Sequence, residues 1–533
     1  MTNLTFNSLE LTDEGLPYSL AIKSIRDPIH GYITVGVNEL SIVDSPFLQR
    51  LRRVKQLQTA YLVYPGAEHS RFQHSLGVMH LTGKFALSLI RNTIANKGKK
   101  VDSYYFIPKL YNLEIDDTQE LISHLLAIRI AGLIHDIGHG PYSHAFDDSI
   151  ISNSQELNRR GVNSHEDLGF HILKNYLVEE IKKAVKTRKT MLNEDILYDC
   201  LYYILSPRKE KEKYKVTSLC KSLRYVLREF IYPADILDFT IRDSYYSGAK
   251  EFGMVDANRL MMFSVILLSE VEEAPQKETL IAPFDNALNT LRAFLYSRFW
   301  LFNNVYFHKI SRVFDYVVKN TLRELNKCIS LEEPLLNMLD GDPSDFLMLD
   351  DLYILHKAKE CGRVAWEWGK RILNREIPFR EIYKGELHLP RYAKGDLALE
   401  DLKIPEHPEK IANELKSFIS EEIGVSETDL IIDYPHLRFF PDNPYLPDKT
   451  FLLLERRGED SLGVRNLTVG DILFGSIIDV TVLRVFISKN TSSSIDNNKL
   501  RYLRDKLRKS EIIDKFTRSL LYHWGRSDLG VTM

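Results

Sequence analysis

Long apolar runs, signal-peptide features and an excess of one charge sign are all missing from this 533-residue chain. No run of eighteen apolar residues occurs, so we expect no membrane-spanning helix. The 70 Lys and Arg residues nearly balance the 73 Asp and Glu residues. This balance excludes a global attraction to nucleic acid or membranes and leaves only local basic patches. The N-terminal segment MTNLTFNSLELTDEG is acidic, the opposite of a signal peptide, so we expect a cytoplasmic protein.

Cysteine is also scarce. The four cysteines, Cys200, Cys220, Cys328 and Cys361, include no CxxC pair, and they are too few for a disulfide scaffold in a chain of this length. We expect four free thiols in a reducing compartment. The hydrophobic content of 44% and the charged content of 27% are those of a globular protein with a large core, divided into two to four domains.

The residue pattern predicts a mostly α-helical fold, made of a helical body over residues 1–384 and a smaller α+β C-terminal region over residues 385–533. The segment ELISHLLAIRIAGLIHDIGHGP is apolar on all sides, which predicts a buried helix from Leu121 to Ile137. Further helices are expected over 291–325 and 352–375. From Gly385 the chain becomes rich in Pro and Gly, which is typical of a linker.

Short β-like runs follow the predicted linker. They lie at 429–435, 450–456 and 476–488, and a helix is expected over 499–524. The segment 490–498, NTSSSIDNN, predicts a loop. Two basic stretches in the body, KKAVKTRK and RKEKEKYK, indicate a solvated insertion, with contact to nucleic acid as the open alternative.

Histidine is distributed unevenly. Nine of the 16 histidines fall between His69 and His171, a fifth of the chain. The strongest feature there is His135-Asp136, which follows the buried apolar segment AGLI. A buried carboxylate is costly unless it is paired or binds a metal. His74 and Asp235 are further candidate ligands, and two imidazoles with two carboxylates suit Mn, Fe, Zn, Ni or Mg without selecting among them.

A second group of imidazoles and carboxylates follows the His135-Asp136 pair, in GHGPYSHAFD and HED. In it Asp147 is spaced to orient the ring of His144. Such a group beside a metal provides a Lewis acid and a proton shuttle, as hydrolysis of a phosphate ester requires. Its members are His139, His144, Asp147, His165 and Glu166.

These residues, in this order, resemble those of the HD-domain deoxynucleoside triphosphate triphosphohydrolases, in the branch that includes the vertebrate enzyme with a SAM and an HD domain. The resemblance spans about residues 22–320, and no counterpart of the SAM domain is expected. It is carried by the segments IRDPIHGYI, DSPFLQRLRRVKQL, YPGAEHSRFQHSLGV, AGLIHDIGHGPYSHAFD, HED, DILDFTIRD and VYFHK.

The resemblance implies a reaction and a role for each matching residue. Water would attack the α-phosphorus, releasing a deoxynucleoside and inorganic triphosphate. His74, His135, Asp136 and Asp235 would hold the metal. His144, backed by Asp147, would act at the scissile phosphate, with His139, His165 and Glu166 lining the site. Arg71 would bind the α-phosphate and Arg298 the outer phosphates. The residues implied to enclose the deoxyribose are Gln56, Leu57, Asp243 and Tyr306.

The resemblance also implies regulation by a nucleotide. GTP or dGTP would bind a second site near the N-terminus and drive assembly of a homo-oligomer, a tetramer or a dimer. The residues at the positions of that allosteric site are Lys23, Asp44, Gln49 and Arg52, with Val63 and Tyr64 at a neighbouring one.

Four positions depart from the vertebrate pattern. Ile236, Phe239, Phe302 and Phe307 stand where the vertebrate enzyme has a lysine, a tyrosine, a histidine and a glutamine, so each removes a polar contact to substrate. Two other functions stay open on the residues alone. One is an HD hydrolase acting on a nucleoside monophosphate or an alarmone. The other is a non-catalytic nucleotide sensor or nucleic-acid binder.

Overall fold

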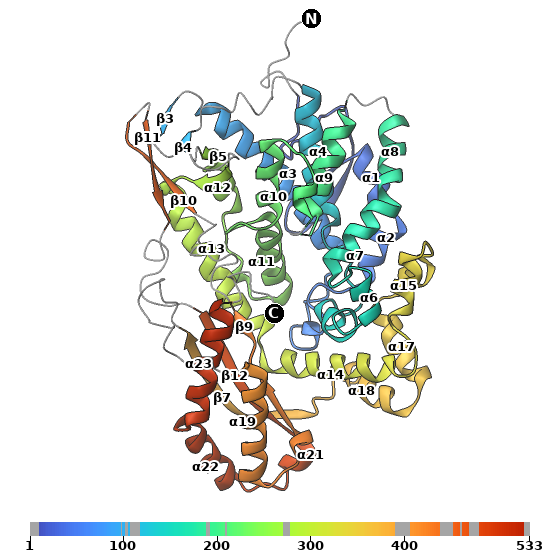
Figure 1. Cartoon of the computed structure of the whole chain (residues 1–533), viewed down its shortest axis with the longest axis vertical. Coiled ribbons are helices and arrows are strands. Elements are labelled where there is room, and N and C mark those ends of the chain that lie inside the picture. Colours follow the sequence, from blue (N-terminus) through green and yellow to red (C-terminus); the bar gives the residue numbers. More distant parts are fainter. Residues whose placement is uncertain are drawn as a thin grey trace, which may run out of the picture.

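The computed structural model of the chain describes residues 10–96, 99–101, 105–106, 118–187, 192–207, 210–269, 278–389, 406–437, 451–458, 461–467 and 479–526. Within these residues the protein is mostly helical with four small sheets, which confirms the predicted fold class. A large helical body fills the upper part of Figure 1, and a smaller unit of helices and strands lies below it. No helix in the described ranges has the length and apolarity needed to cross a bilayer.

The helical body contains α1 to α18. Their bounds are α1 (Val37–Val43), α2 (Pro46–Arg50), α3 (Arg71–Ala95), α4 (Thr118–Ile134), α5 (His144–Phe146), α6 (Gln155–Arg159), α7 (His165–Ile172), α8 (Val178–Thr187), α9 (Glu194–Leu205), α10 (Ser218–Leu227), α11 (Ala234–Ser247), α12 (Ala257–Met262), α13 (Leu288–Leu301), α14 (Lys309–Asn326), α15 (Glu333–Leu339), α16 (Ser344–Met348), α17 (Asp351–Cys361) and α18 (Arg363–Leu373).

The long helices α3 and α4 pack against each other at the centre of the body. Leu125, Ile128 and Leu133 of α4 are fully buried, as expected for a helix that is apolar on every side. The helix ends at Ile134, three residues before the predicted end. Because it ends there, His135 and Asp136 lie in a turn at the helix terminus and not on the helix itself.

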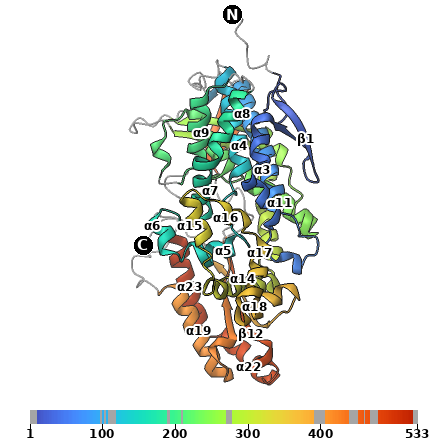
Figure 2. The same cartoon turned by 90° about the vertical axis from the view of Figure 1, so that its right-hand side faces the viewer.

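Three small sheets belong to the body. β1 (Ala21–Asp27) and β2 (Gly31–Gly36) form an antiparallel hairpin along one edge of the body (Figure 2). β4 (Tyr105–Phe106), β5 (Ser264–Ser269) and β6 (Glu278–Pro283) form the second sheet. In the third, β10 (Leu452–Arg456) and β11 (Ser461–Asn466), which come late in the chain, pair with β3 (Lys100–Val101). Leu452, Leu453 and Leu454 of β10 are buried in the core of the helical body.

The C-terminal unit has its own sheet and its own hydrophobic core. β12 (Asp479–Ser488) lies at the centre of the sheet, between β7 (Phe379–Leu389) on one side and β8 (Leu430–Asp433) and β9 (His436–Leu437) on the other, and all pairs are antiparallel. The helices α19 (Pro408–Ile423), α22 (Asn497–Arg508) and α23 (Glu511–Arg526) contribute the rest of this core. β7 crosses residue 384, so the position of the boundary between the two regions stays a prediction.

The predicted β-runs at 429–435, 450–456 and 476–488 correspond to β8, β10 and β12. The predicted linker is wrong at its start, because 385–389 continue β7, and most of its remainder lies outside the described residues. The predicted loop at 490–498 is replaced in part by α21 (Lys489–Ser492) and by the first turn of α22, where the Asp496 side chain accepts a hydrogen bond from the backbone N–H of Asn498.

The expectation of four free thiols is wrong in this structure. Cys200 on α9 is bridged to Cys220 on α10, and Cys328 after α14 is bridged to Cys361 at the end of α17. The Cα atoms of the two pairs are 5.6 and 6.0 Å apart. Helix packing brings each pair together, and this packing leaves no trace in the spacing of cysteines along the chain.

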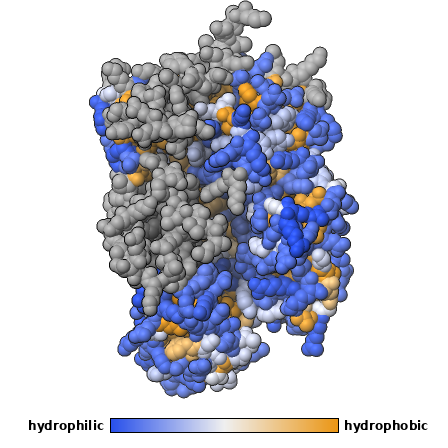
Figure 3. Space-filling model, viewed as in Figure 1, coloured by the Kyte–Doolittle hydropathy of each residue, from blue (hydrophilic) through white to orange (hydrophobic). Residues whose placement is uncertain are grey.

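The surface agrees with the charge balance of the sequence. On the face shown in Figure 3, hydrophilic residues cover most of the coloured surface, and hydrophobic residues form small, separate groups. The described surface on this side therefore shows no broad apolar patch of the kind that marks a large permanent interface.

Candidate metal centre and active site

Four side chains from three separate segments converge beside the N-terminus of α3. His74 lies in the first turn of α3, His135 and Asp136 in the turn after α4, and Asp235 in the first turn of α11. One ligand atom each of His74, His135 and Asp136 lies within 4.8 Å of the others. Oδ1 of Asp235 is 3.1 Å from Nε2 of His74 and 3.6 Å from Nε2 of His135. The four predicted metal ligands are thus brought together.

Both imidazoles of this cluster are held by the ring nitrogen that points away from it. Nδ1 of His135 donates to the carbonyl of Gly132 at 2.9 Å, and Nδ1 of His74 donates to Oδ2 of Asp238 at 2.8 Å. Nε2 of His135 is buried and makes no hydrogen bond to any described residue. With Nδ1 as the donor, Nε2 carries the lone pair that a metal requires. The donor set therefore fits a divalent cation.

Asp238 and its partners form a buried network behind His74. Besides His74, this carboxylate contacts Nε2 of His30 at 2.6 Å and the guanidinium of Arg242 at 2.8 Å. Arg242 in turn donates to Asp27 at 2.8 Å. The sequence pattern did not indicate Asp238, because Asp235 is an equally acidic residue on the same helix. His30 also lies in a turn, where its backbone N–H donates to Asp27 at 2.9 Å.

The electrostatics of the cluster favour ionised carboxylates. Burial alone would raise the pKa of Asp136, but the positive charges of His135 and Arg71 hold that pKa well below its usual range. Arg71 contacts Asp136 directly through Nη1 and donates from Nε to Ser143 Oγ at 2.7 Å. Burial likewise opposes protonation of His74, yet Asp235 and Asp238 outweigh it and raise the pKa of His74 to about 10. A cation at this site would take over the role of that proton.

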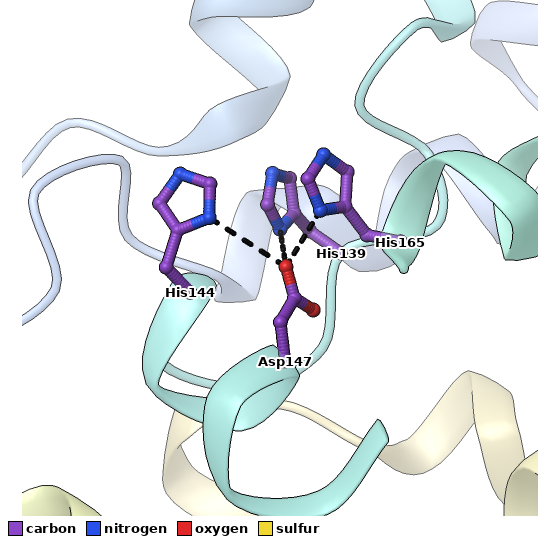
Figure 4. Close-up of side chains that lie close together, drawn as sticks. All are labelled: His139, His144, Asp147 and His165. Carbon is purple, nitrogen blue, oxygen red and sulfur yellow. Dashed lines mark hydrogen bonds and ion pairs between the residues drawn. The ribbon is translucent and has the colours of Figure 1, made fainter. Parts of the chain in front are cut away.

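The second cluster gathers three imidazoles around one carboxylate oxygen (Figure 4). Oδ2 of Asp147 lies 2.6 Å from Nδ1 of His165, 3.5 Å from Nδ1 of His144 and 3.7 Å from Nδ1 of His139. The rings of His139 and His165 are stacked with centroids 3.5 Å apart. Asp147 was expected to orient His144, and the structure shows that His165 is its nearest partner. Burial, with the nearby charge of Arg71, keeps the pKa of His139 well below its usual value, so that ring is neutral.

The turn that carries these histidines is tightly held. Tyr142 and Ser143 have positive φ angles of 54° and 53°, a costly conformation for residues other than glycine. The guanidinium of Arg50 donates to the carbonyls of Ile137 and His139 at 3.1 and 2.5 Å. A Cβ on Gly138 would lie 2.0 Å from the carbonyl oxygen of His165, so only glycine allows this turn to approach α7 so closely.

The two clusters line one cavity of about 280 Å³. This cavity contains all four predicted metal ligands, together with His139, His144, His165 and Glu166. Its lining residues are Gln56, Arg71, His74, His135, Asp136, His139, His144, His165, Glu166, Leu227, Arg228, Asp235 and Phe239.

A second cavity of about 310 Å³ adjoins the first and shares four lining residues with it, Gln56, Arg71, His144 and Phe239. Leu57, Asp243 and Tyr306 also line it, as predicted. The Tyr306 hydroxyl donates to Oδ2 of Asp243 at 2.5 Å, and His69 contacts the other oxygen at 2.7 Å. One face of α11 carries Asp235, Phe239 and Asp243, and it runs from the metal-ligand cluster to the second cavity.

Some predicted residues lie elsewhere. Arg298 on α13 is buried, with its guanidinium 5.0 Å from the ring centre of Phe302, and it does not line either of these two cavities. Two residues of the first cavity had not been predicted, Leu227 and Arg228. Both residues precede α11 by only a few positions. The sequence signal that could have identified Arg228 as a site residue was a basic residue just before the apolar FIYP segment.

The predicted allosteric residues lie on the N-terminal hairpin and the helices after it. Arg52 donates from Nε to Oε1 of Gln49 at 2.7 Å and stacks 3.6 Å from the ring centre of Phe72. Nε2 of Gln49 donates to the carbonyl of Val43, next to Asp44. Gln49 and Arg52 are thus neighbours of Asp44, while Lys23 lies on β1.

Val63 and Tyr64 stand at the neighbouring predicted position. These residues follow a short 3₁₀ turn, Ala60–Leu62, and the Tyr64 hydroxyl donates to the carbonyl of Asn304 at 2.5 Å. The allosteric role of all these residues stays a prediction.

Comparison with known proteins gives matches to two family models, which cover successive parts of the chain. A family model described as HD domain matches residues 71–220, and one described as HD associated region matches residues 275–444. The chain is similar to the deoxynucleoside triphosphate triphosphohydrolase SAMHD1 homolog of Dictyostelium discoideum, with 27% identity over 68% of this chain and 59% of that protein. It is also similar to the SAMHD1 enzyme of Homo sapiens, with 30% identity over 58% of this chain and 46% of that protein.

The chain therefore spans less than two thirds of the length of these two relatives. Among solved structures, a phosphohydrolase of Bacteroides thetaiotaomicron has a similar fold, with a TM-score of 0.55, 20% identity, and coverage of 88% of this chain and 100% of that one. The HD-domain model covers α3 to α9 and only the start of α10, which includes His74, His135, Asp136 and the whole second cluster. With both models matched in order and these relatives along most of its length, the chain contains an HD domain followed by an HD associated region and is similar to phosphohydrolases.

Proposed function

We propose that this protein is a metal-dependent dNTP triphosphohydrolase, which converts a dNTP and water into a deoxynucleoside and inorganic triphosphate. The observation that carries the proposal is the junction of the two cavities. The four candidate metal ligands line the first cavity, and the Tyr306–Asp243 pair lines the second. Arg71 and His144 line both cavities. A nucleotide that spans the junction would place its α-phosphate between these two residues.

His74, His135, Asp136 and Asp235 would hold the divalent cation, and their donor types leave Mn, Fe, Zn, Ni and Mg as candidates. When bound, such a cation supplies Lewis acidity toward phosphate and lowers the pKa of water. Asp238 contributes from behind the cluster, because it fixes the tautomer and the orientation of His74.

The remaining groups act on the substrate itself. Arg71 is held by Asp136 and Ser143 and faces both cavities, so it would stabilise negative charge developing on the α-phosphate without having to reorganise. The side chain of His144 is 64% exposed and lines both cavities. It would donate a proton to the departing 5′ oxygen, while Asp147 accepts from its Nδ1 and so keeps Nε2 directed at the substrate.

Gln56, Leu57, Asp243 and Tyr306 would enclose the deoxyribose. The Tyr306 hydroxyl already donates its hydrogen bond to the Asp243 carboxylate, and Leu57 is apolar. The described wall of the cavity therefore offers few hydrogen-bond partners to an additional hydroxyl on the sugar. Phe302 and Phe307 line the same cavity, where the vertebrate pattern has polar residues. We infer that the base is held mainly by aromatic contacts.

Regulation is part of the proposal. GTP or dGTP would bind beside Lys23, Asp44, Gln49, Arg52 and Val63 and promote a homo-oligomer, a tetramer or a dimer. The support is the contact between Gln49 and Arg52 next to Asp44, together with the similarity to the SAMHD1 relatives.

The deciding experiment is product analysis. The purified chain is incubated with each of the four dNTPs and several divalent metals, with and without GTP, and the products are separated by ion-exchange chromatography. Release of triphosphate and a deoxynucleoside supports the proposal. Turnover of nucleoside monophosphates or alarmones alone would point to a different HD hydrolase, and inactivity toward all of them would favour a nucleotide sensor.

A further inference from the structure

Arg228 lies at the C-terminal end of α10, and no sequence pattern had assigned it a role. It follows the last residue of the helix with an extended backbone, φ −150° and ψ 171°. Glu229, the next residue, has a positive φ of 64°, a costly conformation for a residue other than glycine. Its carboxylate accepts a hydrogen bond from Arg224 at 2.8 Å, which holds the turn. The turn separates Arg228 from the helix and places it in the wall of the first cavity.

Arg228 makes one ion pair among the described residues, with Glu166, while Glu229 and Asp235 act on it at longer range. Its side chain is 17% exposed, and its ion pair with Glu166 is loose, with 3.4 Å between Nη1 and Oε2. The Glu166 side chain is 50% exposed, so water can replace Arg228 as its partner at little cost. Burial lowers the pKa of the Arg228 guanidinium, which remains cationic at neutral pH because an unperturbed arginine titrates so far above it. The cavity wall therefore contains a cation whose direct ion pair, with Glu166, is loose and easily replaced.

The other arginine of the cavity is already engaged. Arg71 and Arg228 are the two arginines among its lining residues, which include no lysine, and Arg71 contacts both Asp136 and Ser143. The resemblance implies a lysine and a histidine at the positions of Ile236 and Phe302, and both residues are apolar in this chain. Among the described residues that line this first cavity, Arg228 is the one guanidinium besides Arg71 that a polyphosphate extending from the metal-ligand cluster could meet.

We propose that Arg228 is a phosphate-binding residue of this enzyme, which binds the outer phosphates of the substrate by exchanging its contact with Glu166 for a bidentate contact with phosphate oxygens. The planar guanidinium fits a phosphate edge with two parallel hydrogen bonds, which an ammonium group cannot form. The identity of the substrate as a triphosphate rests on the proposed function. The role of Arg228 in anion binding does not, because it can be measured with inorganic triphosphate alone.

The test compares the wild-type chain with Arg228→Gln and Arg228→Lys, each saturated with Mn²⁺. Isothermal titration measures the affinity for inorganic triphosphate and, separately, for a deoxynucleoside. We expect Arg228→Gln to weaken triphosphate binding about tenfold to a hundredfold, as loss of a charge-assisted hydrogen bond predicts. Arg228→Lys should recover part of that loss, and deoxynucleoside affinity should stay within about twofold, since that ligand has no phosphate. In hydrolysis assays the same change should raise KM for the dNTP more than it lowers kcat.

Arg159→Gln is the matched control. Arg159 is an exposed arginine that pairs only with Glu156 among the described residues, so its removal should leave triphosphate affinity unchanged. The wild-type chain gives an independent measurement. An arginine-specific dicarbonyl reagent should modify Arg228, and triphosphate should protect it, as read by peptide mass spectrometry. This measurement serves even if a variant fails to fold.

The outcomes separate the two proposals. Triphosphate affinity that is equal in wild type and Arg228→Gln, or modification of Arg228 that triphosphate does not slow, overturns the assignment of Arg228 even if dNTPs are hydrolysed. Binding of triphosphate that depends on Arg228 in a chain that hydrolyses no dNTP supports Arg228 and overturns the proposed function.

Discussion

Nδ1 of His74 lies 2.8 Å from Oδ2 of Asp238, and this contact directs the opposite nitrogen of the ring toward Asp235, 3.1 Å away. Asp238 is fully buried and also neutralises Arg242. One carboxylate thus both orients a proposed metal ligand and compensates a buried cation. Carboxylate partners of this kind set the tautomer of a ligating histidine and tune its basicity.

The Asp238→Asn change should weaken metal binding. The amide cannot compensate Arg242 and holds the ring of His74 less firmly, so affinity for a divalent metal should fall about tenfold to a hundredfold. The unfolding temperature should also fall, because a buried arginine loses its charge partner. Titration with Mn²⁺ and thermal unfolding measure both effects. Asp433→Asn is the control, since Asp433 pairs with Arg312 outside the cluster and should affect stability alone. Equal metal affinity in wild type and Asp238→Asn would contradict this role.

Removal of the metal should abolish activity reversibly. After treatment with a chelator, hydrolysis should stop and return on addition of Mn²⁺, since the four donors would lose the cation that polarises phosphate. Asp136→Ala should lower kcat by at least about 10² to 10³, the usual effect of losing one strong electrostatic group at the reacting centre. Metal analysis and steady-state rates provide the readout. Full activity of Asp136→Ala would remove the basis for a metal centre here.

Tyr306→Phe should weaken substrate binding through the sugar. The Tyr306 hydroxyl donates to Asp243, and its loss leaves one oxygen of that buried carboxylate without its donor. We expect kcat/KM for a dNTP to fall about tenfold, with little change in affinity for inorganic triphosphate. Tyr245→Phe is the control, because Tyr245 lies on the same helix as Asp243 but is 44% exposed. A Tyr306→Phe enzyme with unchanged kcat/KM would argue against a sugar site in the second cavity.

Stability should fall in mild acid because of His124. Its Nδ1 donates to the carbonyl of Glu120 and its Nε2 accepts from Thr217, both at 2.7 Å, and burial lowers its pKa to about 4. The folded pKa lies below the unfolded value of about 6.5, so the unfolded chain binds the proton more tightly. The stabilisation is complete above about pH 6.5 and is lost as the pH falls toward 4.

The size of this effect follows from linkage. Between pH 7 and pH 5 His124 should account for about 2 kcal/mol of lost unfolding free energy. Urea unfolding of wild type and His124→Gln at both pH values isolates this contribution. The variant should lose about 2 kcal/mol less than wild type over that interval, and identical losses in the two proteins would show that His124 does not titrate in this way.

Several elements of the site were predictable because local pattern and chemistry agree there. The carboxylate of a His-Asp pair that follows a buried apolar helix needs a partner for its negative charge. The spacing of Asp235, Phe239 and Asp243 places all three on one face of α11. Other contacts were not predictable. Nothing in the sequence distinguishes Asp238, which supports His74, from Asp235, which faces the cluster, because both are acidic residues on the same helix.

The sequence by itself determined the helical class, the imidazole-rich segment and the residue types that can hold a divalent cation, because helix periodicity and ligand chemistry are local properties. Tertiary structure alone decided that Arg228 enters the cavity, that Asp147 lies closest to His165, that β10 and β11 return to the helical body, and that the cysteines are paired. These are contacts between segments far apart in the chain. They depend on how helices pack, and packing is set by the sum of many weak interactions that no short motif contains.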